Sequence, residues 1–297
     1  MANKKVSDRH THQQEAPVPK GRLLAIGGHE DRGNGDLKEE QKRNVDFESE
    51  EILKFLVSEL RGADPMVLVV PTASAIPEEV SKEYISTFRS LGVKRVEVLD
   101  IRQRSEAQGP AFHKLVEAAA GIMFTGGDQL RLTSILGGTA VLELMKERYT
   151  YDDILIAGTS AGATAMSTPM IYEGVAKGGS IKGDVRITTG LEFLKNIAID
   201  THFIQRGRIV RISQCIATNP GCIGIGLEED TAIYVREGKE IEVLGSGLVT
   251  IVDGTGISRT NIYEIETGEP FTVCDLKVHL LSNGERYTIP TYDQLHI

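Results

Sequence analysis

Apolar residues occur along the chain in short continuous runs separated by longer amphipathic stretches. Runs such as 66–70 and 154–157 are bounded by proline, glycine or aspartate, which is typical of strands buried on both faces of a parallel sheet. The stretches between such runs carry apolar residues at helical spacing among charged ones. The predicted strands cover residues 21–28, 66–70, 93–99, 121–124 and 154–157, and the predicted helices cover 47–60, 80–91, 111–120, 130–136 and 139–148.

Strands that alternate with helices at this interval predict an α/β fold. We expect a three-layer structure in which a mostly parallel sheet is covered by helices on both faces. The pattern changes after residue 168. A glycine-rich stretch, 169–190, predicts loops or a hairpin, buried strands are expected at 193–199 and 222–227, and short alternating strands are expected at 232–235, 241–244 and 248–252.

The domain organisation follows from the same pattern. Residues 1–20 are polar and contain Pro17 and Pro19, so we expect a disordered tail. No proline- or serine-rich linker precedes the short strands near the C-terminus. We therefore expect 21–297 to form a single domain, with 231–297 as a β-rich C-terminal appendage that completes it.

The strongest chemical signal lies around Ser160. Gly158-Thr159-Ser160-Ala161-Gly162 follows the predicted strand 154–157 and precedes small, helix-compatible residues. A Gly-x-Ser-x-Gly pattern between a strand and a helix predicts a nucleophile elbow, because a sharp turn leaves no room for large side chains beside the serine. The alternative is that Ser160 only caps the helix that follows it.

Several other polar or glycine-rich segments also follow predicted strands. In open α/β sheets, ligands bind beyond the carboxyl ends of the strands. Gly27-Gly28, the segment 125–129 and the segment 159–161 all occupy such ends. We therefore expect three loops to converge on one crevice.

A nucleophilic serine requires a base and a group that orients the base. His29 and His202 are the histidines at strand ends, and His202 is favoured because it follows the predicted strand 193–199, in the half of the sheet after the elbow. Glu229, at the end of the next strand, is the candidate acid. Glu228 and Asp230 compete with it, and Asp184 or Asp200 would restore the Ser, acid, His order of α/β-hydrolases.

The negative charge of a tetrahedral intermediate requires at least two aimed donors. Ala161, directly after the candidate nucleophile, supplies one backbone N–H. Gly127 is the candidate for a second, because glycine allows a close approach of the backbone.

Charge and composition narrow the function further. The 297 residues include 33 Lys and Arg against 42 Asp and Glu, a formal net charge of -9, which argues against a general nucleic-acid or anionic-membrane binder. We expect a cytoplasmic protein, since there is no apolar segment typical of a secretory signal or a membrane span and the cysteines are only three, Cys215, Cys222 and Cys274. The Gly27-Gly28 pair lacks the spacing of a dinucleotide fingerprint.

Four ordered motifs carry a more specific signal. Together they resemble the cyanophycinases, a family of serine peptidases related to the α-aspartyl dipeptidases and built on a class I glutamine-amidotransferase-like, flavodoxin-like fold. The match spans roughly residues 22–252. The motifs are Phe124-Thr125-Gly126-Gly127-Asp128-Gln129, Gly158-Thr159-Ser160-Ala161-Gly162-Ala163, Asp200-Thr201-His202-Phe203 with Arg206, Arg208 and Arg211 behind it, and Gly226-Leu227-Glu228-Glu229-Asp230-Thr231.

The resemblance implies the roles of these residues. Ser160 would be the nucleophile, His202 the base and Glu229 the orienting acid. The family hydrolyses cyanophycin, a poly-aspartate that carries arginine on each side-chain carboxyl, to β-aspartyl-arginine dipeptides, without metal or organic cofactor. A homodimer is also implied. The substrate pocket would be lined by Gln129, Asp128, Asp200, Thr201, Arg206, Arg208 and Arg211.

The substrate chemistry fits such a lining. Arginines suit paired recognition of carboxylates, so Arg206, Arg208 and Arg211 are expected to hold the aspartate side. The guanidinium groups are expected to meet Asp128, Glu30, Glu173 or Asp200. One departure from the family is Thr201, where its pattern has a glutamine, and the long N-terminal tail is another.

Two rival functions are consistent with the same sequence. An α-aspartyl dipeptidase that acts on small Asp-X peptides would share the fold and the elbow. A catalytically silent binding protein on the same scaffold is the rival of another class, since a fold does not determine a function.

Overall fold

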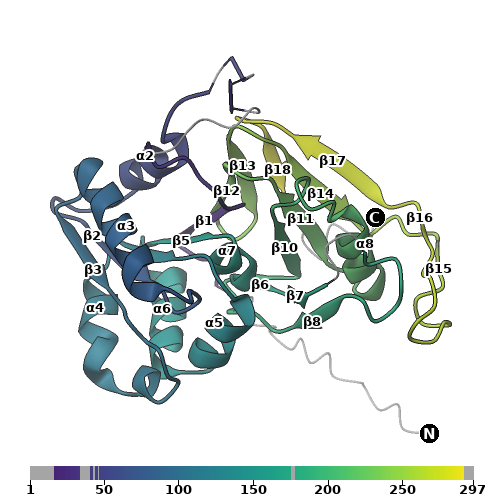
Figure 1. Ribbon diagram of the computed structural model, residues 1–297, viewed down its shortest axis with the longest axis horizontal. Coiled ribbons are helices and arrows are strands. Elements are labelled where there is room, and N and C mark those ends of the chain that lie inside the picture. Colours follow the sequence, from purple (N-terminus) through teal and green to yellow (C-terminus); the bar gives the residue numbers. More distant parts are fainter. Residues whose placement is uncertain (1–16, 34–40, 43, 46, 175–177, 291–297) are drawn as a thin grey trace, which may run out of the picture.

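The largest element of the protein is a mixed sheet of eight strands. The computed structural model describes residues 17–33, 41–42, 44–45, 47–174 and 178–290, so most of the predicted tail, 1–16, lies outside the described residues. The sheet has the order β18-β13-β12-β1-β5-β4-β2-β3 (Figure 1). Its parallel part comprises β1 (Arg22–Ile26), β5 (Leu155–Thr159), β4 (Gly121–Phe124), β2 (Met66–Val70) and β3 (Arg95–Val98). Its antiparallel part comprises β12 (Thr231–Arg236), β13 (Glu240–Gly245) and β18 (Arg286–Thr288).

A second sheet of four strands has the order β10-β11-β14-β17. β10 (Ile197–Thr201) and β11 (Ile223–Leu227) are parallel, whereas β14 (Val249–Asp253) and β17 (Lys277–Leu281) are antiparallel to their neighbours. Three short two-stranded pairs complete the strands: β6 (Ser167–Thr168) with β9 (Leu194–Lys195), β7 (Met170–Glu173) with β8 (Arg186–Thr188), and β15 (Arg259–Thr260) with β16 (Val273–Cys274).

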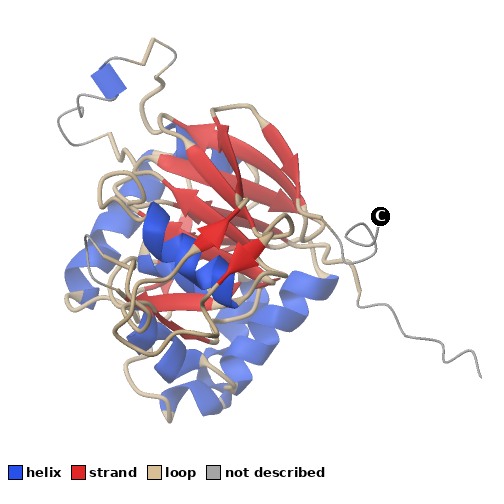
Figure 2. Cartoon of the chain, turned by 90° about the vertical axis from the view of Figure 1, so that its right-hand side faces the viewer, coloured by secondary structure: helices blue, strands red, loops and turns tan. Residues whose placement is uncertain are grey.

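Helices cover both sheets (Figure 2). Alternate residues of β1 show how: Leu24 and Ile26 pack in a core with α2 and α3, whereas Leu23 and Ala25 face a second core that α5, α6 and the four-stranded sheet share. A third core lies between the second sheet and α8. The helices are α2 (Glu51–Ser58), α3 (Pro77–Ser90), α4 (His113–Ala118), α5 (Gln129–Leu136), α6 (Ala140–Tyr151), α7 (Ala161–Ala165) and α8 (Ile209–Thr218), with the 3-10 turns η1 (Glu106–Gln108) and η2 (Pro110–Phe112).

The α/β class is confirmed, and the C-terminal part is rich in strands as expected. These strands do not form a separate layer, because β12, β13 and β18 extend the first sheet while β14 and β17 extend the second. The expectation that the strand before His202 belongs to the same sheet as the elbow is wrong. β12 pairs antiparallel with β1 and occupies that edge, so β10 pairs with β11 in the second sheet instead.

The helices in the described residues can be compared with the length that a membrane span requires. None of the helices in that part of the chain is both long enough and apolar enough to cross a bilayer.

Candidate active site

Ser160 lies on the turn between β5 and α7 in a strained conformation. Its backbone has φ 51° and ψ -113°, a region that residues with a side chain rarely adopt. The turn is held on both sides, because Ser160 N–H donates to Ile26 O at 2.9 Å and Thr164 N–H donates to Ser160 O at 2.9 Å. These two hydrogen bonds hold the strained turn in place, and they thereby fix the Ser160 hydroxyl beyond the end of β5.

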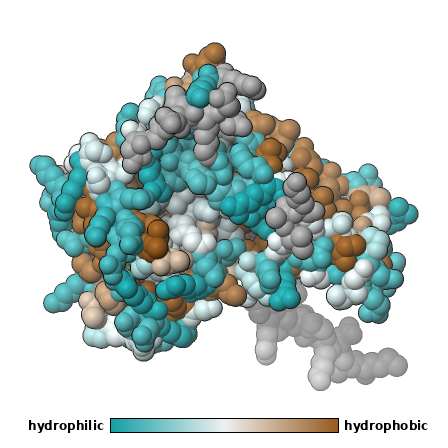
Figure 3. Space-filling model, viewed as in Figure 1, coloured by the Kyte–Doolittle hydropathy of each residue, from teal (hydrophilic) through white to brown (hydrophobic). Residues whose placement is uncertain are grey.

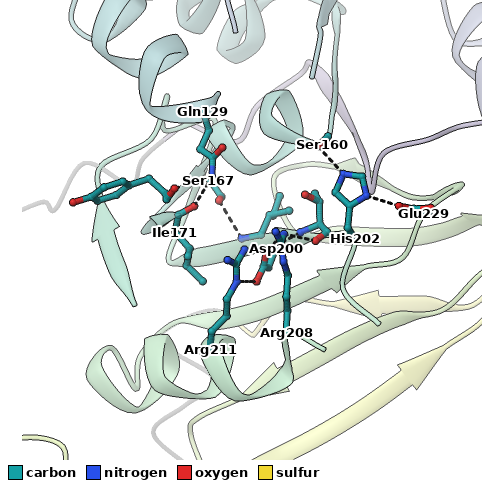
Figure 4. Close-up of polar contacts among 12 residues, drawn as sticks. Gln129, Ser160, Ser167, Ile171, Asp200, His202, Arg208, Arg211 and Glu229 are labelled. Atoms are coloured by element: carbon teal, nitrogen blue, oxygen red, sulfur yellow. Dashed lines mark hydrogen bonds and ion pairs between the residues drawn. The ribbon is translucent and has the colours of Figure 1, made fainter. Parts of the chain in front are cut away.

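The serine contacts a histidine that contacts a glutamate. Ser160 Oγ lies 2.9 Å from His202 Nε2, and His202 Nδ1 lies 2.7 Å from Glu229 Oε1 (Figure 4). The three residues follow the ends of β5, β10 and β11, so the two sheets meet at this point. The arrangement is that of a nucleophile, a general base and the group that orients the base.

The competing acids serve other partners. Asp230 accepts hydrogen bonds from Asp31 N–H at 2.8 Å, from the Gln41 side chain at 2.8 Å and from the Ser246 hydroxyl at 2.7 Å, so it anchors the loop beside the site. Asp184 accepts from Gly179 N–H at 3.3 Å. Of the candidates weighed from the sequence, Glu229 is the one that the structure brings to His202 Nδ1.

Burial sets the protonation of His202. The residue is only 5% exposed, and burial lowers the pKa of its imidazole below the ordinary value of 6.5. The charge of Arg206 lowers this pKa further, whereas Glu229 raises it. The net lowering favours the neutral imidazole, which is the form that accepts a proton.

The loop after β1 is pressed against His202. Gly28 has φ 102°, and a Cβ added there would lie 2.6 Å from His202 Cε1, so the backbone approaches the imidazole as only glycine allows. His202 N–H donates to Gly27 O at 3.1 Å, and Asp230 N–H donates to Gly28 O at 2.9 Å. This loop thereby fixes the next residue, His29, whose Nε2 lies 3.7 Å from Glu229 Oε1.

Glu30, the residue after His29, supports the site through a contact with Thr159 that the sequence does not predict. Glu30 Oε2 accepts a hydrogen bond from the Thr159 hydroxyl at 2.7 Å, and Glu30 Oε1 accepts from Tyr84 at 2.6 Å and from Arg32. Burial alone would raise the pKa of Glu30, but Arg32 and the two hydroxyl donors outweigh it and lower the pKa. An ionised carboxylate thus lies beneath the residue that precedes Ser160. Its sequence position in a charged loop gave no signal of this burial.

The backbone segments that carry the two candidate oxyanion donors lie next to Ser160. Ala161 begins α7, so its N–H has no acceptor within the helix. A Cβ added at Gly126 would lie 3.5 Å from Ser160 Cβ, which places the 126–127 backbone next to the serine. Gly127 has φ 142°, and an added Cβ would lie 2.1 Å from Ala73 O, so only glycine fits there.

Asp200 does not lie where a ligand can reach it. It is 0% exposed, and its carboxylate accepts hydrogen bonds from Arg211 Nε at 2.5 Å, from Arg211 Nη2 and from Arg208 Nη1 at 2.9 Å (Figure 4). Burial and the charges of Arg211 and Arg206 lower the pKa of Arg208 to about 10, although Asp200 opposes this. The expectation that Asp200 contacts a substrate directly is not supported by its position. Asp200 and the two arginines instead join the end of β10 to α8.

Substitution of Asp200 by asparagine is expected to destabilise the fold by about 3–5 kcal/mol, because the buried guanidinium of Arg211 and the partly buried guanidinium of Arg208 lose their counter-ion. Urea unfolding measures this change. The matched control is Glu173→Gln, which breaks an exposed pair with Arg186 at 3.3 Å and is expected to cost less than about 1 kcal/mol. Equal effects of the two substitutions would contradict a structural role for Asp200.

The remaining predicted substrate residues differ in exposure. Gln129 Nε2 donates to Ile171 O at 3.1 Å and to Tyr172 O at 3.4 Å, so its amide holds β7 next to α5. Asp128 is exposed, and its carboxylate caps α5 by accepting from Leu130 N–H and Arg131 N–H. Thr201 is buried, whereas Arg206 is exposed and close enough to His202 for its charge to act on the imidazole.

Within the described residues, one group of three metal-ligating side chains comes together. It comprises His29, His202 and Glu229, whose ligand atoms all lie within 4.8 Å of one another.

Comparisons with known proteins point to a peptidase family. Residues 39–243 match the model of peptidase family S51, and this range contains Ser160, His202 and Glu229. The chain is 35% identical to the cyanophycinase of Trichormus variabilis, covering 97% of this chain and 95% of the relative. It is 33% identical to the cyanophycinase of Geminocystis herdmanii, covering 92% and 95%. A crystal structure of a peptidase from an acI-B1 Actinobacterium shares the fold, with a TM-score of 0.63 and 23% identity over 92% of this chain and 98% of that one.

Proposed function

The chain belongs to peptidase family S51, and from this membership and the geometry of the site we propose that it is a serine exopeptidase that degrades cyanophycin to β-aspartyl-arginine dipeptides. The observation that carries the proposal is the continuous contact from Ser160 Oγ through His202 to Glu229, with separations of 2.9 and 2.7 Å. The turn that carries Ser160 is then a nucleophile elbow.

The reaction follows from the positions of these three residues. Ser160 Oγ attacks the carbonyl carbon of an aspartyl peptide bond while His202 Nε2 takes its proton. Glu229 accepts the hydrogen bond from Nδ1–H and stabilises the imidazolium that forms. The N–H groups of Gly127 and Ala161 stabilise the negative charge on the carbonyl oxygen, each by about 3 kcal/mol in the transition state.

Collapse of the tetrahedral intermediate completes the first half of the reaction. The imidazolium gives its proton to the leaving amine, and an acyl-enzyme on Ser160 remains. Water then attacks the acyl-enzyme with His202 again as the base, which releases the dipeptide and restores the hydroxyl. No cofactor is needed for these steps.

Substrate recognition falls to the exposed charges near the site. Arg206 binds a carboxylate of the substrate in this proposal, which its exposure supports, since Arg208 and Arg211 are engaged by Asp200. Among the carboxylates considered for the guanidinium groups, Glu30 and Asp200 are buried and paired. The exposed Asp128 and Glu173 are therefore the better partners.

Incubation of the purified protein with insoluble cyanophycin tests the proposal. Release of β-aspartyl-arginine by the wild type and its loss in Ser160→Ala are expected. Asp-X dipeptides distinguish the rival α-aspartyl dipeptidase, and faster turnover of these than of the polymer would favour the rival. Identity of 33–35% over nearly the whole chain to cyanophycinases favours the polymer. Failure of a serine-reactive phosphonate to label Ser160 would favour a silent scaffold.

The pH profile of kcat/KM is expected to have an acid limb below pH 6.5. His202 acts as a base only when neutral, and burial lowers its pKa, so activity persists below pH 6.5 and is lost as the pH falls through the lowered pKa. Arg206→Gln removes a positive charge that lowers this pKa, and the limb is expected to move to higher pH. A wild-type midpoint above 6.5, or no movement in Arg206→Gln, would contradict this account.

A homodimer in the cytoplasm completes the proposal. β17 is an edge strand whose Val278 and Leu280 are 50% and 61% exposed, and hydrophobic surface follows this edge of the molecule (Figure 3). Pairing of such edges between two copies would cover this surface, and sedimentation would then give twice the monomer mass of 32.4 kDa.

The free Cys215, Cys222 and Cys274 are typical of a protein in a reducing compartment such as the cytoplasm, which cell fractionation tests.

A further inference from the structure

His29 stands beside the proposed triad without a role in the proposed hydrolysis. Its Nε2 lies 3.7 Å from Glu229 Oε1, and its ring meets the His202 ring edge-on at 5.3 Å between centroids. The same Glu229 oxygen lies 2.7 Å from His202 Nδ1. Two imidazoles thus approach one carboxylate, and their ligand atoms lie within 4.8 Å of one another.

These separations match a transition-metal site. Zinc binds imidazole nitrogen and carboxylate oxygen at about 2.0–2.1 Å in tetrahedral geometry, so neighbouring ligand atoms lie about 3.3 Å apart. The observed 2.7 and 3.7 Å lie on either side of that value. All three ligand atoms lie within 4.8 Å of one another, so shifts of these side chains, above all of the exposed His29, would bring them to a shared ion.

The three side chains differ in exposure, so that an ion can reach the site through His29 while the other two ligands are held within the protein. The side chain of His29 is 62% exposed, whereas those of Glu229 and His202 are 16% and 6% exposed. An ion therefore arrives from the side of His29, and a fourth position on that side remains for water. His29 itself has φ 48°, and the hydrogen bonds of Gly27 O to His202 N–H and Gly28 O to Asp230 N–H fix the loop that presents it.

We propose that His29, Glu229 and His202 form an inhibitory binding site for Zn²⁺ or a similar divalent transition-metal ion. The ion takes the lone pair of His202 Nδ1 and one oxygen of Glu229, and the proton that Nδ1 carried moves to Nε2. Nε2 then donates to Ser160 Oγ and can no longer accept its proton. The enzyme is held in the wrong tautomer with its nucleophile unactivated.

Binding is tested by calorimetric titration with zinc chloride, with His279→Ala as a control that removes a histidine from the remote strand β17. His29→Ala is expected to raise the zinc Kd at least about tenfold, whereas His279→Ala and Ser160→Ala are expected to bind as the wild type does. Equal affinity in wild type and His29→Ala, or no saturable binding, would overturn the site.

Inhibition is tested by the rate at which a serine-reactive phosphonate labels Ser160. Zinc is expected to slow labelling of the wild type at concentrations near its Kd, with recovery after chelation, and to require higher concentrations in His29→Ala. Bound zinc that leaves the labelling rate unchanged would overturn the inhibitory role.

The inhibitory role rests on the proposed function, whereas zinc binding by the inactive Ser160→Ala does not. Absence of cyanophycin hydrolysis together with His29-dependent zinc binding would therefore refute the proposed function and support the metal site.

Discussion

Ser160→Ala is expected to lower kcat for cyanophycin hydrolysis by about 10⁴- to 10⁶-fold, because no other hydroxyl occupies the position from which the carbonyl is attacked. The hydroxyl is held 2.9 Å from His202 Nε2 by a turn whose backbone is bonded to β1 and α7. Dipeptide release under saturating substrate measures the loss. Ser213→Ala, which removes an exposed hydroxyl from α8, serves as the matched control and is expected to retain the wild-type rate.

Ser160→Gly separates the chemistry of this residue from its strain. A glycine adopts φ 51° and ψ -113° without the steric cost that a Cβ imposes. The variant is therefore expected to be as inactive as Ser160→Ala but more stable than the wild type by about 1 kcal/mol in urea unfolding. Lower stability of the glycine variant would show that the turn is not strained.

Four non-glycine residues with left-handed backbone surround the site. They follow the ends of four strands that meet there, and each has φ near 50°: His29 after β1, Ser160 after β5, His202 after β10 and Asp230 after β11. Such conformations cost free energy and persist where the surrounding structure enforces them. Their concentration around one site supports a functional reason for each, and two of them belong to the proposed triad.

The parallel part of the fold followed directly from the sequence. Runs such as Met66–Val70 and Gly121–Phe124 are strands with the predicted bounds, because an apolar run between turn residues has few other ways to bury itself. The structure brings Ser160, His202 and Glu229, which the resemblance groups together, into contact with one another. The local pattern of apolar and polar residues therefore predicts where each residue lies along its own strand or helix.

The same local patterns do not predict which strands pair with one another in the sheets. Nothing in the residues of β10 distinguishes a strand beside β1 from a strand beside β11, since both choices bury the same side chains. For the same reason the sequence predicts Asp200, Arg208 and Arg211 on a substrate surface, whereas these three residues pair with one another beneath it. Charged residues are usually exposed, and a buried pair is recognised only when both partners are located.

Glu229→Gln is expected to lower kcat by about 10³- to 10⁴-fold. An amide lacks the negative charge that stabilises the imidazolium, and its N–H₂ group can present a donor to Nδ1, which favours the tautomer that cannot act as a base. The hydrogen bond and charge of Glu229 also raise the pKa of His202. The acid limb of the remaining activity is therefore expected to move to lower pH in the variant.

The neighbouring Glu228→Gln is the matched control, since it removes one carboxylate from the same turn and leaves the contact with Nδ1 intact. It is expected to change kcat by less than about tenfold and to leave the acid limb in place. A greater loss of kcat in Glu228→Gln than in Glu229→Gln would show that Glu228, and not Glu229, orients His202. A loss of kcat in Glu229→Gln with no movement of the acid limb would mean that Glu229 does not stabilise the charged form of His202, because loss of its charge and hydrogen bond is expected to lower the pKa of the imidazole.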